Sequence, residues 1–281
     1  MDTTKTKFIK MHGCGNDYIY FNGMDVKNPD VLAVKLSDRN KSIGGDGVVL
    51  ILPSEIADAK MQMYNADGSE GLMCGNSIRC VGKYLFDNGM VKTMQMTIET
   101  ASGVKQLELL RGSCGNITAA RVDMGPALLS PVQIPVNLSG SMIVDRTISI
   151  AGNHYEVTCV SMGNPHAIIF HDDIDHYDLH KTGAAFEASG VFPEGVNVGV
   201  VQMAGRNNMR MRVWERGTGE TMASGTGACA AAVAAVLMGF CDKDTDIKVE
   251  VEGGVLTVNY TDAAVYMTGD CVTIYEGVVN L

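Results

Sequence analysis

Several features that mark membrane, secreted or nucleic-acid-binding proteins are missing from this sequence. The longest nearly unbroken apolar run, 228–238, is shorter than the roughly 18 residues that suggest a membrane-spanning helix. The N-terminal stretch MDTTKTKFIKMHGCG has no hydrophobic signal core. The formal net charge is −10, and no basic run is present. We therefore expect a cytoplasmic protein whose partner is neither a nucleic acid nor a membrane.

Motifs for cofactors and metals are also missing. The eight cysteines contain no CxxC pair, so we interpret them as reduced thiols and expect no metal site. No pyridoxal lysine motif is evident. The glycine-rich stretch GTGETMASGTG could be a phosphate loop, but it lacks both the GxxxxGK[ST] lysine and the GxGxxG pattern. It is not a GxSxG elbow either, because Met222 stands two residues before Ser224. We expect no cofactor.

A repeat divides the chain into two halves. The stretches GLMCGNSIRC and TMASGTGACA each place a cysteine or a serine before a glycine, and a glutamate stands four residues earlier in both. A Gly-Asn pair precedes each stretch: the interval from Asn16 to Cys74 nearly equals the interval from Asn164 to Ser224. Two features at matched spacing predict two similar domains offset by about 150 residues, with a boundary near the turn MGPALLSP at 124–131.

Each half is predicted to be rich in strands, with one strong helix. The expected strands alternate in polarity and carry β-branched or aromatic residues; they are 117–123, 154–160, 209–214 and 255–260. Cys74 and Ser224 each begin a predicted helix, one reaching about Asp87 and the other Met238. The second helix is apolar almost all round, so we expect it to be buried within a sheet.

The two predicted helix starts could perform acid and base chemistry. Unpaired amides and the helix dipole at an N-terminus bind a carboxylate and lower the pKa of a cysteine placed there. If both helix starts serve one amino acid, Cys74 and Ser224 lie on opposite faces of its Cα, which is the arrangement of a two-base racemase or epimerase. A cysteine before a glycine at a helix start is usually structural, but the repeat favours catalysis.

Polar residues in turns could complete such a site. The asparagines at 16, 65, 164 and 197 lie in glycine-containing or turn-like segments, where asparagine often only holds its own loop. His166 follows a turn and is by default a packed or solvated histidine. Glu215 and Arg216 could bind an ammonium and a second carboxylate, although a surface ion pair is the alternative.

The sequence resembles the diaminopimelate epimerase family over nearly its whole length. The resemblance rests on KMHGCGNDYIY, DRNKSIGGDG, YNADGSEGLMCGNSIRC, VSMGNPH, GVNVG, RVWERGTGET, SGTGACAAAVAA and YMTGD. It implies an α/β (α+β) fold of two pseudo-symmetric domains, each a mostly antiparallel sheet curled around a central apolar helix. The expected domains are 1–124 with a returning strand at 269–281, and 125–268.

The resemblance also implies roles for individual residues. Cys74 resembles one of two catalytic cysteines, and His166 and Glu215 resemble groups that assist proton transfer. Positions that match the family's contacts to the substrate's carboxylates and amino groups are Asn16, Asn65, Gly75, Asn76, Asn164, Asn197, Glu215, Arg216, Gly225 and Thr226. Gly47 stands where some members have a glutamine, so one contact to the distal carboxylate is expected to be missing.

Ser224 departs from the family, which has its second catalytic cysteine at this position. An alkanol is a far weaker acid than a thiol of pKa about 8.5, so we expect impaired epimerisation of diaminopimelate. The serine is either an introduced substitution or a natural variant. The alternative functions are a related amino-acid racemase, a hydroxyamino-acid dehydratase, or a catalytically silent amino-acid-binding protein. The expected partner is a small molecule, and a homodimer is a possible assembly.

Overall fold

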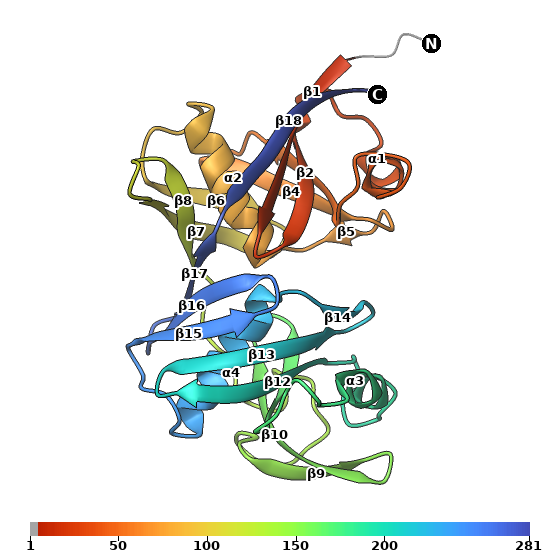
Figure 1. Cartoon of the computed structure of the whole chain (residues 1–281), viewed down its shortest axis with the longest axis vertical. Helices are drawn as coiled ribbons and strands as arrows, with labels where there is room; N and C mark the ends of the chain where they lie inside the picture. Colours follow the sequence, from red (N-terminus) through yellow and green to blue (C-terminus); the bar gives the residue numbers. More distant parts are fainter. Residues whose placement is uncertain (1–4) are drawn as a thin grey trace. The chain divides into compact units, whose positions relative to one another are not determined.

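The computed structural model describes residues 5–281, and the chain divides into two compact units (Figure 1). Unit 1 contains Met1–Val122 and Thr268–Leu281, and unit 2 contains Asp123–Met267. Each unit combines a sheet with a central helix and a shorter outer helix. The expected fold class, a mixed α and β protein dominated by sheet, is confirmed.

Unit 1 is built on a mostly antiparallel sheet. Its strands are β1 (Lys5–Gly13), β2 (Asn16–Asn22), β3 (Gly47–Leu52), β4 (Ala59–Asn65), β5 (Glu70–Gly71), β6 (Gln95–Thr100), β7 (Gly103–Arg111), β8 (Ile117–Asp123) and β18 (Val272–Asn280). Strand β18, from the end of the chain, pairs with β1. The pairs β2 with β3 and β4 with β6 are parallel, and the remaining pairs within this unit are antiparallel.

Two helices of unit 1 flank this sheet. Helix α2 (Gly75–Asp87) contacts β1, β2, β6 and β7, and most of its side chains are buried. Two of them are cationic: Arg79 donates to the carbonyl of Gly75 at 3.0 Å, and Lys83 donates to the carbonyl of Ile117 at 3.0 Å. The outer helix α1 (Pro29–Ser37) follows the short 3-10 helix η1 (Gly23–Asp25) and contacts β3 and β4.

From β10 (Asn153–Ser161) onward, unit 2 repeats the order of strands and of the outer and central helices in unit 1, but one of the strands that pair with β10 precedes it in the chain. Its strands are β9 (Arg146–Ile150), β10, β11 (Pro165–Phe170), β12 (Asn197–Gly205), β13 (Asn208–Glu215), β14 (Gly219–Thr221), β15 (Asp246–Val251), β16 (Gly254–Tyr260) and β17 (Val265–Asp270), the last of which ends in unit 1. Helix α4 (Gly225–Leu237) contacts six of these strands, and the outer helix α3 (Leu179–Glu187) contacts β12, β13 and β14. The apolar character of α4 predicted its burial, and this is confirmed.

The pairing register repeats between the units. Leu50 of β3 pairs with Gln62 of β4, and Val200 of β12 pairs with Arg212 of β13. Val200 follows Leu50 along the chain by the same number of residues as Arg212 follows Gln62. Helix α4 follows α2 by that interval too. The parallel pairs repeat as well, β11 with β12 and β13 with β15. The repeat expected from the sequence is therefore a repeat of backbone pairing, and corresponding positions in the two units can be compared directly.

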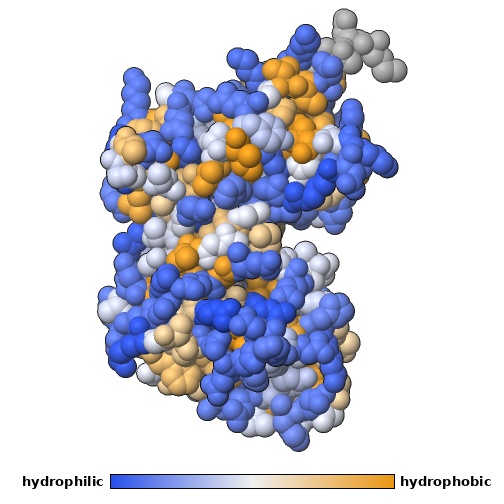
Figure 2. All heavy atoms as spheres, in the orientation of Figure 1, coloured by the Kyte–Doolittle hydropathy of each residue, from blue (hydrophilic) through white to orange (hydrophobic). Residues whose placement is uncertain are grey.

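The surface of unit 1 includes an apolar edge. In Figure 2, hydrophobic atoms gather on the part of unit 1 where β1 and β18 lie. Along β18, Ile274, Tyr275 and Val278 are between 44% and 58% exposed. No helix within residues 5–281 combines the length and the apolar character needed to cross a membrane.

Candidate active site

Cys74 begins the central helix of unit 1. It is the N-cap residue of α2, with extended backbone angles of −128° and 120°, and its side chain makes no capping hydrogen bond. Its half-buried thiol instead donates to Oδ1 of Asn16 at 3.1 Å. The first amides of a helix have no partner within the helix. The start of α2 therefore places a thiol beside the polarised N-terminus of a helix.

Asn16 is held in one orientation by a carboxylate. Its Nδ2 donates to Oδ2 of Asp46 at 2.7 Å, so its carbonyl oxygen is the atom that faces the thiol. Asp46 in turn accepts from the Arg39 guanidinium at 3.0 Å and from the backbone N–H of Asp17 at 3.0 Å. The amide cannot flip without placing its oxygen against a carboxylate. Asp46 thus fixes Asn16 as the acceptor for Cys74.

The remaining predicted residues of unit 1 lie in the first turn of α2 or at the paired ends of β3 and β4. Gly75 and Asn76 form the first turn of α2, and the buried Oδ1 of Asn76 has no hydrogen-bond partner among residues 5–281. Asn65 ends β4 and donates from Nδ2 to Ser69 at 3.0 Å. Gly47 has no room for a side chain, because an added Cβ would lie 2.0 Å from a backbone carbonyl oxygen.

Ser224 occupies the same place in unit 2, but its contacts differ. It is the N-cap of α4, with backbone angles of −123° and 116°, and its Oγ accepts from the N–H of Gly227 at 3.3 Å. The hydroxyl donates to Oε2 of Glu215 at 3.0 Å. The other carboxylate oxygen, Oε1, accepts from Thr221 at 2.6 Å. A carboxylate therefore stands directly behind the serine hydroxyl.

Three more predicted residues meet beside the helix that Ser224 begins. Nδ2 of Asn164 donates to the hydroxyl of Thr226 at 3.2 Å, which leaves its Oδ1 to pair with Nε2 of His166 at 3.0 Å. Because that oxygen can only accept, Nε2 carries the proton in this arrangement. Nδ1 of His166 is then an acceptor, buried and without a hydrogen-bond partner in the part of the chain that is described.

His166 is held neutral by its surroundings. Its side chain is completely buried, and burial, assisted by the positive charge of Arg216, lowers its pKa from 6.5 to about 3. A histidine of this kind is uncharged at neutral pH. It can donate from Nε2 and accept at Nδ1, but it does not act as an imidazolium acid.

Arg216 and Asn197 form a third group in unit 2. The buried Asn197 donates to the carbonyl of Pro165 at 3.2 Å and accepts from the backbone N–H of Arg216 at 2.8 Å. The exposed Arg216 side chain donates from Nη1 to the carbonyl of Glu194. Glu215 points to Ser224 and Thr221, so the surface ion pair considered for Glu215 and Arg216 is not what holds either side chain.

The other seven cysteines are poor candidates for catalysis. None of the eight, all of which lie within residues 5–281, is in a disulfide; Cys114 is exposed, and Cys14, Cys80, Cys159, Cys229, Cys241 and Cys271 are buried. Burial raises the pKa of Cys14, Cys80, Cys159 and Cys271 to about 12. A thiol with so high a pKa does not supply a thiolate near neutral pH.

The structure brings most of the predicted residues of each unit into contact and adds two that the sequence did not single out. Asp46 orients Asn16, and Thr221 holds Glu215. Both lie within stretches that resemble the family, GGDG and GTGET, but the sequence analysis assigned neither residue a role. Their roles depend on contacts with another strand, which no local pattern reveals.

Comparison with known families gives an extensive match. The sequence profile described as diaminopimelate epimerase matches residues 8–129 and 158–274. A diaminopimelate epimerase from Acetivibrio thermocellus is 47% identical over 277 residues, covering 98% of this chain and 99% of the relative. One from Desulfovibrio desulfuricans is 48% identical over 281 residues, covering 96% of this chain and 97% of the relative.

Solved structures with low identity share the fold. A hydroxyproline epimerase from Agrobacterium vitis, solved with bound trans-4-hydroxy-L-proline, has a TM-score of 0.73 at 15% identity and covers 99% of this chain and 93% of its own. A phenazine biosynthesis protein of the PhzF family from Bacillus anthracis has a TM-score of 0.71 at 15% identity and covers 99% of this chain and 100% of its own. These likenesses concern the fold alone.

Proposed function

The chain belongs to the diaminopimelate epimerase family and is an isomerase, and we propose that it interconverts L,L- and meso-diaminopimelate by two-base proton transfer without a cofactor. The single observation that carries this proposal is the repeated helix start, where Cys74 and Ser224 share one backbone conformation and one position in their units. A repeated acid or base is what removal and return of a proton on opposite faces of Cα requires.

The helix starts supply the electrostatic part of the reaction. We assign the substrate's α-carboxylate to the amides of Gly75, Asn76, Gly225 and Thr226, which lie in the first turns of α2 and α4. Those amides and the helix dipoles stabilise a carboxylate whose charge grows as the α-proton leaves. The carbanion then needs no pyridoxal group.

We assign a different rate of proton transfer to each unit, fast at Cys74 and slow at Ser224. Cys74 exchanges a proton with one face of Cα, and its thiol regains the hydrogen bond to Asn16 when it is protonated again. On the other face, the proton would pass to or from Ser224, whose hydroxyl already donates to Glu215. A serine alkoxide is not accessible near neutral pH, so this second transfer is slow. The source gene's codon at position 224 tells whether the serine was inherited or introduced.

The polar residues beside the helices are assigned to the substrate's two ends. Asn16, Asn65, Asn164, Asn197 and the carboxylate of Glu215 are proposed to bind its amino groups and to order its chain. Buried acceptors without a partner are costly, and an ammonium donor would satisfy Nδ1 of His166 or Oδ1 of Asn76. Arg216 is exposed and is assigned to the distal carboxylate.

Ligand specificity and α-proton exchange together test this function. Thermal unfolding is measured with diaminopimelate, lysine, proline and 4-hydroxyproline, and loss of the α-proton signal is followed by NMR in D₂O. We expect stabilisation and exchange with diaminopimelate above all. Preference for another amino acid would identify a related racemase or, if a product lacking the hydroxyl forms, a dehydratase. Binding of diaminopimelate with no exchange of either epimer would identify a silent binding protein.

Location and assembly are proposed from simpler observations. All eight cysteines are free thiols, as expected of a cytoplasmic protein in a reducing compartment. The exposed apolar side chains along β18 are compatible with a homodimer. Sedimentation analysis of the purified chain tests the assembly. A monomer at all concentrations would contradict the proposed homodimer.

A further inference from the structure

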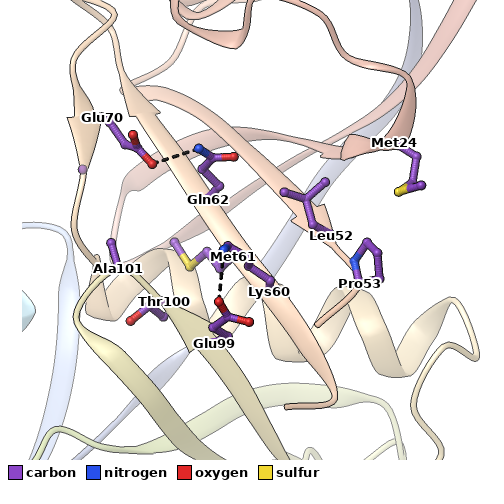
Figure 3. A pocket seen from close by; sticks show the side chains of 11 residues that line it. Met24, Leu52, Pro53, Lys60, Met61, Gln62, Glu70, Glu99, Thr100 and Ala101 are labelled. Atoms are coloured by element: carbon purple, nitrogen blue, oxygen red, sulfur yellow. Dashed lines mark hydrogen bonds and ion pairs between the residues drawn. The ribbon is translucent and has the colours of Figure 1, made fainter. Parts of the chain in front are cut away.

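A hollow of about 460 Å³ lies on unit 1, within the size range of small-molecule sites (Figure 3). Met24, Leu52, Pro53 and Met61 supply an apolar part, and Figure 3 shows Gln62 and Glu70 joined on one side and Lys60 and Glu99 on the other. The remaining lining residues are Gly71, Thr100 and Ala101. None of the residues assigned above to the reaction lines it.

The two carboxylates of this hollow have different partners: Glu99 has a cationic partner, and Glu70 has a neutral one. Lys60 and Glu99 form an ion pair at 3.0 Å, and Ser54 donates to the same glutamate at 2.6 Å. Glu70, in contrast, receives the neutral side-chain amide of Gln62 at 2.9 Å. The carboxylate of Glu70 is thus satisfied by a hydrogen bond whose donor carries no charge.

Unit 2 shows what group completes the same arrangement. Arg212 takes the position of Gln62 and Glu220 takes that of Glu70, at the corresponding places of the matching strands. The Arg212 guanidinium binds Glu220 through two bonds of 2.8 and 3.0 Å. Its Nη1 also donates to the carbonyl of Ile174 at 2.6 Å, in the segment equivalent to the one that carries Met24.

The comparison shows that unit 1 has a glutamine where unit 2 has the guanidinium of Arg212. In unit 2, the Arg212 side chain lies between Glu220 on β14 and the segment that follows β11. At the equivalent place, unit 1 has a shorter neutral side chain and an open volume with an apolar part beside Glu70. A planar cation with two parallel N–H groups matches a carboxylate better than a single amide does. An alkyl chain would cover Met24, which is 68% exposed, and the partly exposed Leu52.

We propose that this hollow binds a small molecule with an alkylguanidinium group, its cation on Glu70 and its alkyl chain along Met24 and Leu52, above the buried Met61. The ligand replaces the side chain that Arg212 contributes in the other unit. The site is proposed as separate from the reaction, because none of the residues that line it is assigned to the substrate or to proton transfer.

Agmatine and N-carbamoylputrescine provide the matched pair of probes, because the second replaces the guanidinium by a neutral urea and keeps the same chain and terminal ammonium. The whole chain is labelled with ¹³C at the methionine methyl groups, and the signals of Met24 and Met61 are assigned by Met→Leu variants. We expect agmatine to shift both signals, and N-carbamoylputrescine to bind about tenfold or more weakly, since a charged hydrogen bond is lost. Equal effects of the two probes, or no shift with agmatine, would overturn the proposal.

Three variants locate the site. Gln62→Arg supplies the cation within the chain, as in unit 2, and Glu70→Gln removes its partner; each should weaken agmatine binding about tenfold or more. Glu108→Gln, which removes one exposed carboxylate from β7, should leave binding unchanged. Cys74→Ala should also leave it unchanged, which separates this site from the reaction. If Gln62→Arg does not fold, Glu70→Gln decides; full agmatine binding by folded Glu70→Gln would contradict the site.

Discussion

The two helix starts share a backbone and differ in chemistry. Cys74 and Ser224 have backbone angles within a few degrees of each other, and each precedes a buried helix. Yet the thiol meets a neutral amide, Asn16, that an aspartate holds in place, while the hydroxyl caps its own helix and donates to Glu215. Duplication of the backbone places the two groups, but the neighbouring side chains decide what each can do.

The same difference extends to the parallel pair β2 and β3 of unit 1 and its counterpart β11 and β12 in unit 2. Tyr18 pairs with Gly47 in unit 1, and His166 pairs with Asn197 in unit 2. Unit 2 thus carries an imidazole and an amide where unit 1 has a phenol ring and a glycine. Unit 1 also has no basic residue that corresponds to Arg216, because Ala66 stands at that position. The proposed recognition of a second carboxylate is therefore assigned to unit 2.

The largest expected effect comes from removing the thiol of unit 1. Cys74→Ala should slow α-proton exchange of diaminopimelate by about 10² to 10⁴, the contribution of a positioned general base. NMR in D₂O measures it. Cys114→Ala, which removes an exposed thiol, is the control and should exchange normally. Normal exchange by Cys74→Ala would end the two-base scheme.

Giving both helix starts a cysteine should raise the rate of net inversion. Ser224→Cys places a thiol next to Glu215 and should raise net inversion by about 10² or more, the lower range for one positioned acid or base. Ser224→Ala is the matched control: it removes the capping bond to Gly227, costs about 1 kcal/mol of stability, and should not raise inversion. Unchanged inversion in Ser224→Cys would mean that the serine is not what limits turnover.

The buried imidazole of unit 2 should make folding sensitive to acid. Its pKa is about 3 in the folded chain and near 6.5 when unfolded, so below pH 6.5 the unfolded chain binds a proton that the folded chain does not. Stability is therefore lost as pH falls, by about 2 kcal/mol between pH 7 and pH 5 from this group. Denaturant unfolding of His166→Gln should lack this loss. An identical loss in both proteins would contradict the burial of a neutral histidine.

The smallest expected effect concerns the residue that unit 1 lacks. Arg216→Lys keeps the charge but not the planar fork, and should weaken diaminopimelate binding about tenfold. Calorimetry on the Cys74→Ala background, where turnover is blocked, measures it. Binding of a monocarboxylate such as lysine should hardly change, and an equal loss for both ligands would argue against a distal carboxylate contact.

The sequence predicted the parts of the fold that have a local signal. The helices expected to begin at Cys74 and Ser224 and to end near Asp87 and Met238 are both confirmed. The expected strand 117–123 coincides with β8. The outer helices α1 and α3 were not predicted, because such short helices have little periodicity to detect.

The candidate site was predictable in its residues and not in its contacts. Motifs pointed to Cys74, Ser224 and Glu215, whose roles in the reaction stay predictions. The bond from Ser224 to Glu215 joins residues that lie close in the chain, but Asp46 acts on Asn16 from a different strand end. The parallel pairing of β2 and β3 creates that contact. Long-range pairing of this kind leaves no pattern in either segment alone.

Separate exchange measurements on the two substrate epimers test the central claim, that the two helix starts differ in basicity, most directly. Each isomer is incubated in D₂O, and loss of its α-proton signal is followed by NMR. The epimer whose α-hydrogen meets Cys74 should exchange mainly with retention, because the thiol returns the deuteron it has collected, and the other epimer should hardly exchange. Equal and rapid exchange of both would show that Ser224, with Glu215 behind it, is a working base, and would contradict the account.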